Sequence, residues 1–179
     1  MPLLELDSPQ MYRGHKSRHS AIFFNKIHGR WADPQGDFGT MYLGETHFCS
    51  FAEAFIQGAS NRFASQSLLA ASCLCPVLTD RPLVLVDLTT GPNLMQIGAD
   101  NRVCDGPHDV SQRWARALWS HPQQPDGLYY RSRNAPEFFS IALFDRVQPA
   151  LREDCSRNLL ADPASSSRLL DYFRCALLP

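Results

Sequence analysis

The amino-acid sequence predicts a single domain of the α+β class. Its 179 residues suit one domain, and fractions of 44% hydrophobic and 20% charged residues are ordinary for a folded chain. Short apolar runs of strand length occur beside segments whose apolar residues recur at helical spacing. The predicted strands are too irregularly spaced for a doubly wound sheet, and the sequence contains neither GxGxxG nor GxxxxGK followed by Ser or Thr. Neither of these two nucleotide-binding fingerprints therefore applies.

Two strands separated by a long polar loop are expected near the start. The first strand opens at residues 11–13. Residues 14–37 are polar and rich in Gly and His, which indicates an extended loop that holds several basic groups. Residues 38–44 have the length and the glycine punctuation of a short strand.

A helix is predicted next, with Thr46 as its N-cap. Glu53 lies about 100° from Ala52 on the helical wheel, so it flanks the buried face and does not point squarely into water. A carboxylate at the edge of a core face is well placed to line a pocket. The buried face has the spacing i, i+3, i+4, i+7 and consists of Phe48, Phe51, Ala52 and Phe55.

Three strands and two helices are expected in the rest of the chain. Residues 82–88 form an apolar run typical of a strand buried on both faces, and strands should follow at 127–132 and 138–144. Asp109 is placed to cap a helix, and residues 167–178 are expected to form a terminal amphipathic helix. One side of the Asp109 helix carries Val110, Trp114, Ala117 and Leu118.

Charge and hydropathy argue against nucleic-acid and membrane partners. A formal net charge of -1 gives no global attraction to a polyanion, so any anion site must be local. The first ten residues carry acids where a signal peptide has a basic segment. The longest stretch without formal charge, residues 63–79, is too short and too polar to span a bilayer. We therefore expect a cytoplasmic protein.

The cysteines and histidines suggest no metal site or disulfide framework. The six cysteines, at positions 49, 73, 75, 104, 155 and 175, form no CxxC pair, and we expect them to be reduced. Cys73 and Cys75 are expected to be buried thiols. His15 and His19 are spaced i, i+4, but no third ligand follows at a zinc-like spacing. A Cys/His nucleophile pair has no local signature, and spacing alone leaves it open.

Four short motifs occur in one order along the chain. They are HGRW at 28–31, GxxGTxYL at 36–43, AE at 52–53 and DGLYYRS at 126–132. Together they resemble the RES domain family, which is named for an arginine, a glutamate and a serine. The resemblance covers residues 12–145 of a single domain, and leaves about 150–179 as a C-terminal helical extension.

The resemblance assigns the named residues to positions in this sequence. The arginine corresponds to Arg30, with Arg13 as the alternative, the glutamate to Glu53 and the serine to Ser132. The family usually has a second glycine where this chain has His28, and an asparagine where it has Ala32. These departures affect the shape of the arginine loop and remove no charged group.

The family resemblance also implies a fold and an activity. The fold is similar to that of ADP-ribosyltransferases, with a split mixed sheet flanked by helices. The activity removes nicotinamide from NAD, which is then a substrate and not a cofactor. Such proteins act as the toxin of a toxin–antitoxin pair, with an Xre-type or other helical antitoxin as partner, and form homo-oligomers or hetero-oligomers with that partner.

The residues suit that chemistry. Cleaving the nicotinamide–ribose bond develops positive charge on the ribose, which the Glu53 carboxylate would stabilise. A neutral base departs, so a second carboxylic acid is not needed as it is in glycosidases. Arg30 and Arg13 suit the pyrophosphate, because a guanidinium binds phosphate oxygens in a bidentate way. Tyr42 offers a face for nicotinamide to stack on, and Ser132 either hydrogen-bonds the ribose or orients Glu53.

Three functions remain open at this level. The first is an NAD glycohydrolase or NAD phosphorylase. The second uses the same site to transfer ADP-ribose to a protein or small-molecule acceptor. The third is a non-catalytic interaction module on the same fold, in which Glu53 is a solvated helix residue and Arg30 lies over the indole of Trp31.

Overall fold

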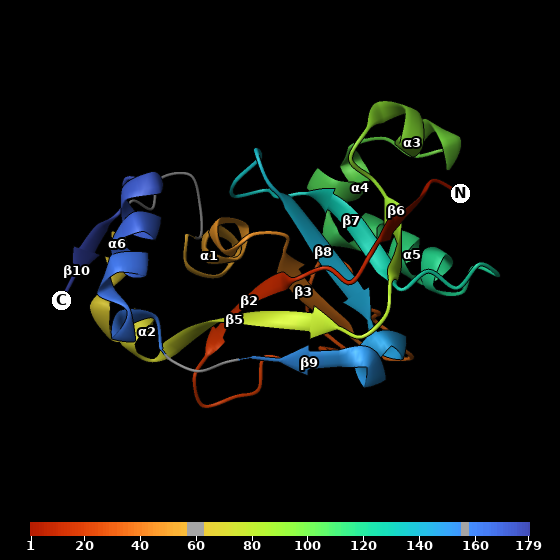
Figure 1. Ribbon diagram of the computed structural model, residues 1–179. Coiled ribbons are helices and arrows are strands. Elements are labelled where there is room, and N and C mark those ends of the chain that lie inside the picture. Colours follow the sequence, from red (N-terminus) through yellow and green to blue (C-terminus); the bar gives the residue numbers. More distant parts are fainter. Residues whose placement is uncertain (57–62, 155–157) are drawn as a thin grey trace.

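The computed structural model describes residues 1–56, 63–154 and 158–179, and it has the α+β class expected from the sequence (Figure 1). Eight strands form one mixed sheet in the order β1-β6-β7-β8-β3-β2-β5-β9. The pair β6–β7 runs parallel and the other neighbouring pairs of this sheet are antiparallel. The strands are β1 Leu3–Leu6, β2 Met11–Lys16, β3 Thr40–Gly44, β5 Ser72–Thr79, β6 Leu83–Asp87, β7 Gly127–Arg131, β8 Phe139–Phe144 and β9 Leu151–Glu153.

The sheet nearly divides between β2 and β3. These two strands share one residue pair, Tyr12 with Gly44, whereas β2 pairs with β5 over six residues and β3 with β8 over five. Helix α1 (His47–Phe55) packs against both strands at the parting. The Ser50 hydroxyl of α1 accepts a hydrogen bond from the Gly14 amide of β2 at 2.8 Å, which satisfies a donor left without a strand partner.

The remaining helices lie in two groups on either side of the sheet. On the side of β6 and β7 lie α3 (Gly91–Gln96), α4 (Arg102–Asp105) and α5 (His108–Trp119) (Figure 1). At the opposite end lie α2 (Gln66–Ala70) and α6 (Pro163–Tyr172), with a small parallel pair formed by β4 (Phe63–Ser65) and β10 (Ala176–Leu178). Two 3₁₀ helices, η1 (Asp145–Ala150) and η2 (Leu159–Ala161), complete the described elements.

Helix α1 forms where the sequence predicts it. The Thr46 side chain accepts a hydrogen bond from the Cys49 amide at 3.1 Å, the N-cap that Ser and Thr favour. Phe51, Ala52 and Phe55 are buried, and Phe51 and Phe55 pack in one cluster with apolar residues of α2 and α6. This packing fixes the rotation of α1, and with it the direction of Glu53.

Helix α5 differs from the expectation in its cap and its buried face. Pro107 occupies the N-cap position, so the prediction that Asp109 caps the helix is wrong. The buried residues are Ser111, Ala115 and Leu118, while Ala117 is exposed. Ser111 is buried because its hydroxyl donates to the Val103 carbonyl at 2.6 Å. Because a polar side chain occupies a core position, the buried face of α5 differs from the face predicted from the spacing of apolar residues alone.

Several strands were not expected from the sequence. β1 pairs with β6, and β2 continues to Lys16 inside the segment expected to be a loop. β5 contains Pro76, a residue that argues against a strand when it is read locally. The terminal helix begins and ends earlier than residues 167–178, and β9 and β10 lie in the segment expected to be helical. Pairing with distant strands stabilises these short segments, and local periodicity does not report it.

The expectation of reduced cysteines is wrong at Cys75, which is disulfide-bonded. Cys49, Cys73 and Cys104 are buried free thiols, and Cys155 lies outside the described residues. A disulfide requires two cysteines that the fold brings to bonding distance, and their spacing along the sequence does not indicate this.

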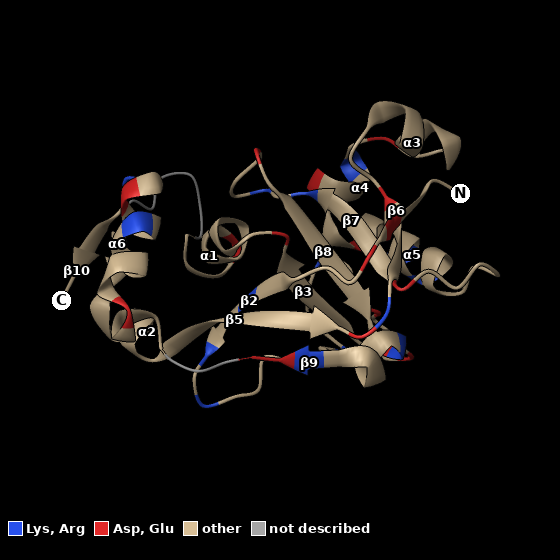
Figure 2. Cartoon of the chain, in the orientation of Figure 1, with Lys and Arg blue, Asp and Glu red and all other residues tan. Residues whose placement is uncertain are grey.

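Charged residues of both signs are distributed over the elements, in keeping with the net charge of -1 (Figure 2). No helix among the described residues is both long enough and apolar enough to cross a bilayer.

Candidate active site

A cavity of about 590 Å³ opens where β2 and β3 part. Four of the five residues singled out in the sequence line it: Arg13 from β2, Arg30 from the following loop, Tyr42 from β3 and Glu53 from α1. The fifth, Ser132, is only 2% exposed and contacts the carboxylate of Glu53 at the end of β7. Five residues spread over 120 positions of the sequence are thus brought together by the parting of the sheet.

The carboxylate of Glu53 is held by the turn that follows β7. Its Oε1 atom accepts hydrogen bonds from the Ser132 hydroxyl at 2.5 Å, the Arg133 amide at 3.0 Å and the Asn134 amide at 3.2 Å. Its Oε2 atom accepts one from the side-chain amide of Asn134 at 3.0 Å. Hydrogen bonds to an ionised acceptor are the stronger kind, so this turn stabilises a negative charge at a fixed position.

Two other titratable groups near Glu53 stay neutral at physiological pH. Burial raises the pKa of the Cys49 thiol to about 11, and its Sγ atom donates to the Phe139 carbonyl at 3.1 Å. Burial also raises the pKa of Tyr130 well above its ordinary value. The thiolate is the reactive form of cysteine, so the raised pKa and the hydrogen bond to a carbonyl both disfavour Cys49 as a nucleophile.

Arg30 ties its loop to the helices at the far side of the cavity. Its Nη1 atom donates to the Gly106 carbonyl at 2.7 Å and to the Ser111 hydroxyl at 3.1 Å. Its Nε and Nη2 atoms make no hydrogen bond to another described residue. One edge of the guanidinium therefore anchors the loop, and the other stays available to an anion in the cavity.

Arg13 of β2 also lines the cavity. Its Nη1 atom donates to the carbonyl groups of Ala21 and Phe23, the latter at 2.8 Å, so it holds the loop after β2. Burial lowers the pKa of Arg13 to about 10, and Glu153 opposes that shift. The side chain is therefore still a cation near neutral pH.

Tyr42 fixes the position of the Arg30 loop. Its hydroxyl accepts a hydrogen bond from the Trp31 amide at 2.8 Å, and burial raises the pKa of Tyr42 to about 12. Gly29 adopts a φ of 129°, and a Cβ atom there would overlap the Tyr42 hydroxyl. Only glycine combines this backbone conformation with so close an approach.

Gly29→Ala is expected to lower the free energy of unfolding by about 1–3 kcal/mol more than Gly98→Ala does, the typical cost of an overpacked site. Both glycines have positive φ, but a Cβ atom at Gly98 meets nothing within 4 Å. The comparison therefore separates the Tyr42 contact from backbone strain. Urea unfolding followed by circular dichroism measures both values. Equal losses for the two variants would show that the loop moves aside freely.

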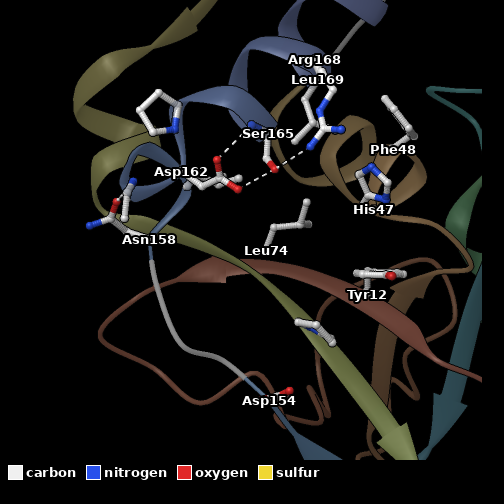
Figure 3. Close-up of a pocket in the computed structure, with 14 residues that line it drawn as sticks. Tyr12, His47, Phe48, Leu74, Asp154, Asn158, Asp162, Ser165, Arg168 and Leu169 are labelled. Atoms are coloured by element: carbon white, nitrogen blue, oxygen red, sulfur yellow. Dashed lines mark hydrogen bonds between the residues drawn. The ribbon is translucent and has the colours of Figure 1, made fainter.

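A second cavity, of about 870 Å³, lies between α1, β2, β5 and α6 (Figure 3). Tyr12, His47 and Phe48 line one side of it, and none of the five residues discussed above takes part. Its polar groups across from them are engaged with one another: Asp162 accepts from the amide and the hydroxyl of Ser165, and Arg168 donates to that hydroxyl at 3.2 Å. The smaller cavity therefore has the better arrangement for chemistry.

Sequence reasoning did not find three groups that support the site: Gly106 and Ser111, which hold Arg30, and Asn134, which holds Glu53. Asn134 follows Ser132 by two residues and precedes Ala-Pro, a composition that signals a turn but gives no hint of its partner. These contacts join residues that lie about 80 positions apart in the sequence.

Comparisons with known proteins agree with the fold and the motifs. The model of the RES domain matches residues 10–164. "Probable toxin y4kH" from Sinorhizobium fredii is 35% identical over 106 residues, which cover 59% of this chain and 82% of that protein. A chain in the crystal structure of the M. tuberculosis MbcT-MbcA toxin-antitoxin complex has a similar fold, with a TM-score of 0.67 and 17% identity over 90% of this chain and 92% of that one.

Proposed function

The chain belongs to the RES domain family, and from this premise we propose that it is a toxin-type enzyme that cleaves the nicotinamide–ribose bond of NAD. The observation that carries the proposal is the Glu53 carboxylate, fixed by hydrogen bonds at the wall of a cavity whose other walls carry Arg13 and Arg30. A placed anion beside two cations suits a substrate that becomes cationic at one carbon and carries a pyrophosphate.

The proposed reaction uses the hydrogen-bond acceptor site that remains free on the Glu53 carboxylate. Its Oε1 atom already accepts three hydrogen bonds, while Oε2 accepts one and has room for a ribose hydroxyl. As the bond between ribose C1′ and the nicotinamide nitrogen breaks, both electrons leave with nicotinamide, which departs neutral. The carboxylate stabilises the positive charge that develops on the ribose, and it acts most strongly in the transition state.

The remaining residues position the substrate. The free edge of the Arg30 guanidinium and the cation of Arg13, which line the same cavity, would bind the pyrophosphate oxygens. Tyr42 would pack against the nicotinamide ring. Of the two roles open to Ser132, its burial and its bond to Oε1 favour orienting Glu53.

The acceptor decides the name of the reaction. An oxygen of water or phosphate forms the new bond to C1′ and gives up its proton to solvent, which yields ADP-ribose or its 1″-phosphate. An acceptor on a protein or a small molecule would instead make the chain an ADP-ribosyltransferase. We propose the first reaction and keep the transferase as the alternative, because the two are separated by their products.

The partner and the compartment follow from the same proposal. A toxin that consumes NAD acts in the cytoplasm and needs an inhibitor in the cell that makes it. We propose an Xre-type or other helical antitoxin that covers the cavity. The relative named as a probable toxin and the fold likeness to a chain of a toxin–antitoxin complex support this partner.

Purified protein is expected to release nicotinamide when it is incubated with NAD. Parallel reactions with and without inorganic phosphate, resolved by chromatography, identify ADP-ribose or a phosphorylated product. NAD labelled in the adenine ring, followed by precipitation of macromolecules from a cell extract, detects transfer to an acceptor. If the protein neither binds nor consumes NAD, the non-catalytic interaction module is the correct description.

A further inference from the structure

The turn at residues 132–135 is held by three hydrogen bonds among residues 132–138. The Ser132 amide donates to the Phe138 carbonyl at 3.0 Å, and the Phe138 amide donates to the Ala135 carbonyl at 2.9 Å. The Ser132 hydroxyl accepts from the Ala135 amide at 3.1 Å. None of these bonds uses the side chain of Asn134, so that side chain is not needed to shape the turn.

The Asn134 side chain instead binds the oxygen of Glu53 that the other donors leave free. Three donors of the turn converge on Oε1, and among the described residues the Asn134 Nδ2 atom is the one donor to Oε2. Rotation about the bond that joins the carboxyl carbon to its chain is soft and moves both oxygens together. The Asn134 contact holds the second oxygen against this rotation, in addition to the three contacts at Oε1.

We propose that Asn134 is a positioning residue for the cleavage of NAD: its side-chain amide fixes Oε2 of Glu53 so that the remaining acceptor site of this oxygen points at the ribose. The inference rests on the proposed function. Asn134 does not line the cavity, and it acts on the substrate only through Glu53.

The test compares Asn134→Ala with Asn93→Ala in the full-length protein. Asn93 is a matched control, because its side-chain amide also donates to a carboxylate, Asp87 at 2.7 Å, outside the cavity. Steady-state kinetics of nicotinamide release are measured together with NAD binding and urea unfolding.

Asn134→Ala is expected to lower kcat by about 10–100-fold and to change the Kd for NAD by less than about twofold, because the lost contact matters most in the transition state. Asn134→Asp, which places a second carboxylate there, should lower kcat further. Asn93→Ala should change neither quantity.

The outcomes separate the two claims. A wild-type kcat in Asn134→Ala, with active wild-type enzyme, overturns the role of Asn134 and leaves the proposed function intact. A fall in kcat that is matched by a loss of unfolding free energy and by a weaker Kd for NAD assigns Asn134 a merely structural role and also overturns the proposal. Wild-type protein that releases no nicotinamide overturns both claims together.

Discussion

Glu53→Gln is expected to lower the rate of nicotinamide release by about 10²–10³-fold, the range for loss of one electrostatic contact to a developing charge. Glutamine keeps the size of the side chain but removes the anion. Its carbonyl oxygen takes the place of Oε1, where three donors converge, and its amide group then meets the side-chain amide of Asn134 donor to donor. Chromatography of the reaction products measures the rate.

The same variant should abolish toxicity. Wild-type protein expressed alone in bacteria is expected to lower cellular NAD before growth stops, and Glu53→Gln should do neither at equal abundance. Glu45→Gln is the control, because Glu45 accepts hydrogen bonds from the Tyr129 hydroxyl at 2.6 Å and the Phe139 amide at 3.0 Å but does not line the cavity. Near wild-type turnover in folded Glu53→Gln protein would remove Glu53 from its assigned role.

Arg30→Lys is expected to lower kcat/KM for NAD by about 5–150-fold, which corresponds to about 1–3 kcal/mol for a charge-assisted bidentate contact. Lysine keeps the charge, but its single nitrogen cannot hold the Gly106 carbonyl and the Ser111 hydroxyl and also present two parallel N–H groups to phosphate oxygens. Stopped assays over a range of NAD concentrations, with folding checked by circular dichroism, provide the measurement.

Arg13 and Arg18 make this experiment decisive about the arginine loop. Arg13→Lys should impair cleavage as much as Arg30→Lys or slightly less, because Arg13 also holds the carbonyl groups of the loop after β2. Arg18 contacts only its neighbour His19 among the hydrogen bonds of the described residues, and its lysine variant should behave as wild type. If Arg30→Lys matched Arg18→Lys, the phosphate contact would belong to Arg13 alone.

The parts of the fold that could be predicted are those whose signals are local. Helix α1 carries its cap at Thr46 and its apolar spacing within ten residues, and both are as predicted. The four motifs that resembled the RES domain are confirmed by the family match over residues 10–164. The site could be approached in the same way, since Arg13, Arg30, Tyr42 and Glu53 do line one cavity.

The parts that sequence reasoning missed depend on contacts between distant residues. β5 is a strand in spite of Pro76 because β2 and β9 pair with it on both sides. Ser111 is buried because it meets both the Val103 carbonyl and Arg30. Asn134 is a turn residue by composition, and its importance to Glu53 comes from a helix 80 positions earlier. The spacing of residues in a single sequence does not indicate such contacts between distant positions.

The parting of the sheet makes α1 a spacer between two strands. Ser50 and Glu53 are three residues apart, so they share one side of the helix: the first satisfies the open edge of β2 and the second faces the cavity. The fit is close, since a Cβ atom on Gly14 would lie 2.5 Å from that of Ala54. Gly14 carries no reactive group, yet any larger residue there would push the spacer outward and carry the carboxylate with it. On the other strand, a Cβ atom on Gly44 of β3 would lie 2.5 Å from the Ser50 amide nitrogen. The distance between β2 and β3 and the position of the Glu53 carboxylate are therefore linked through α1, which packs closely against a glycine on each strand.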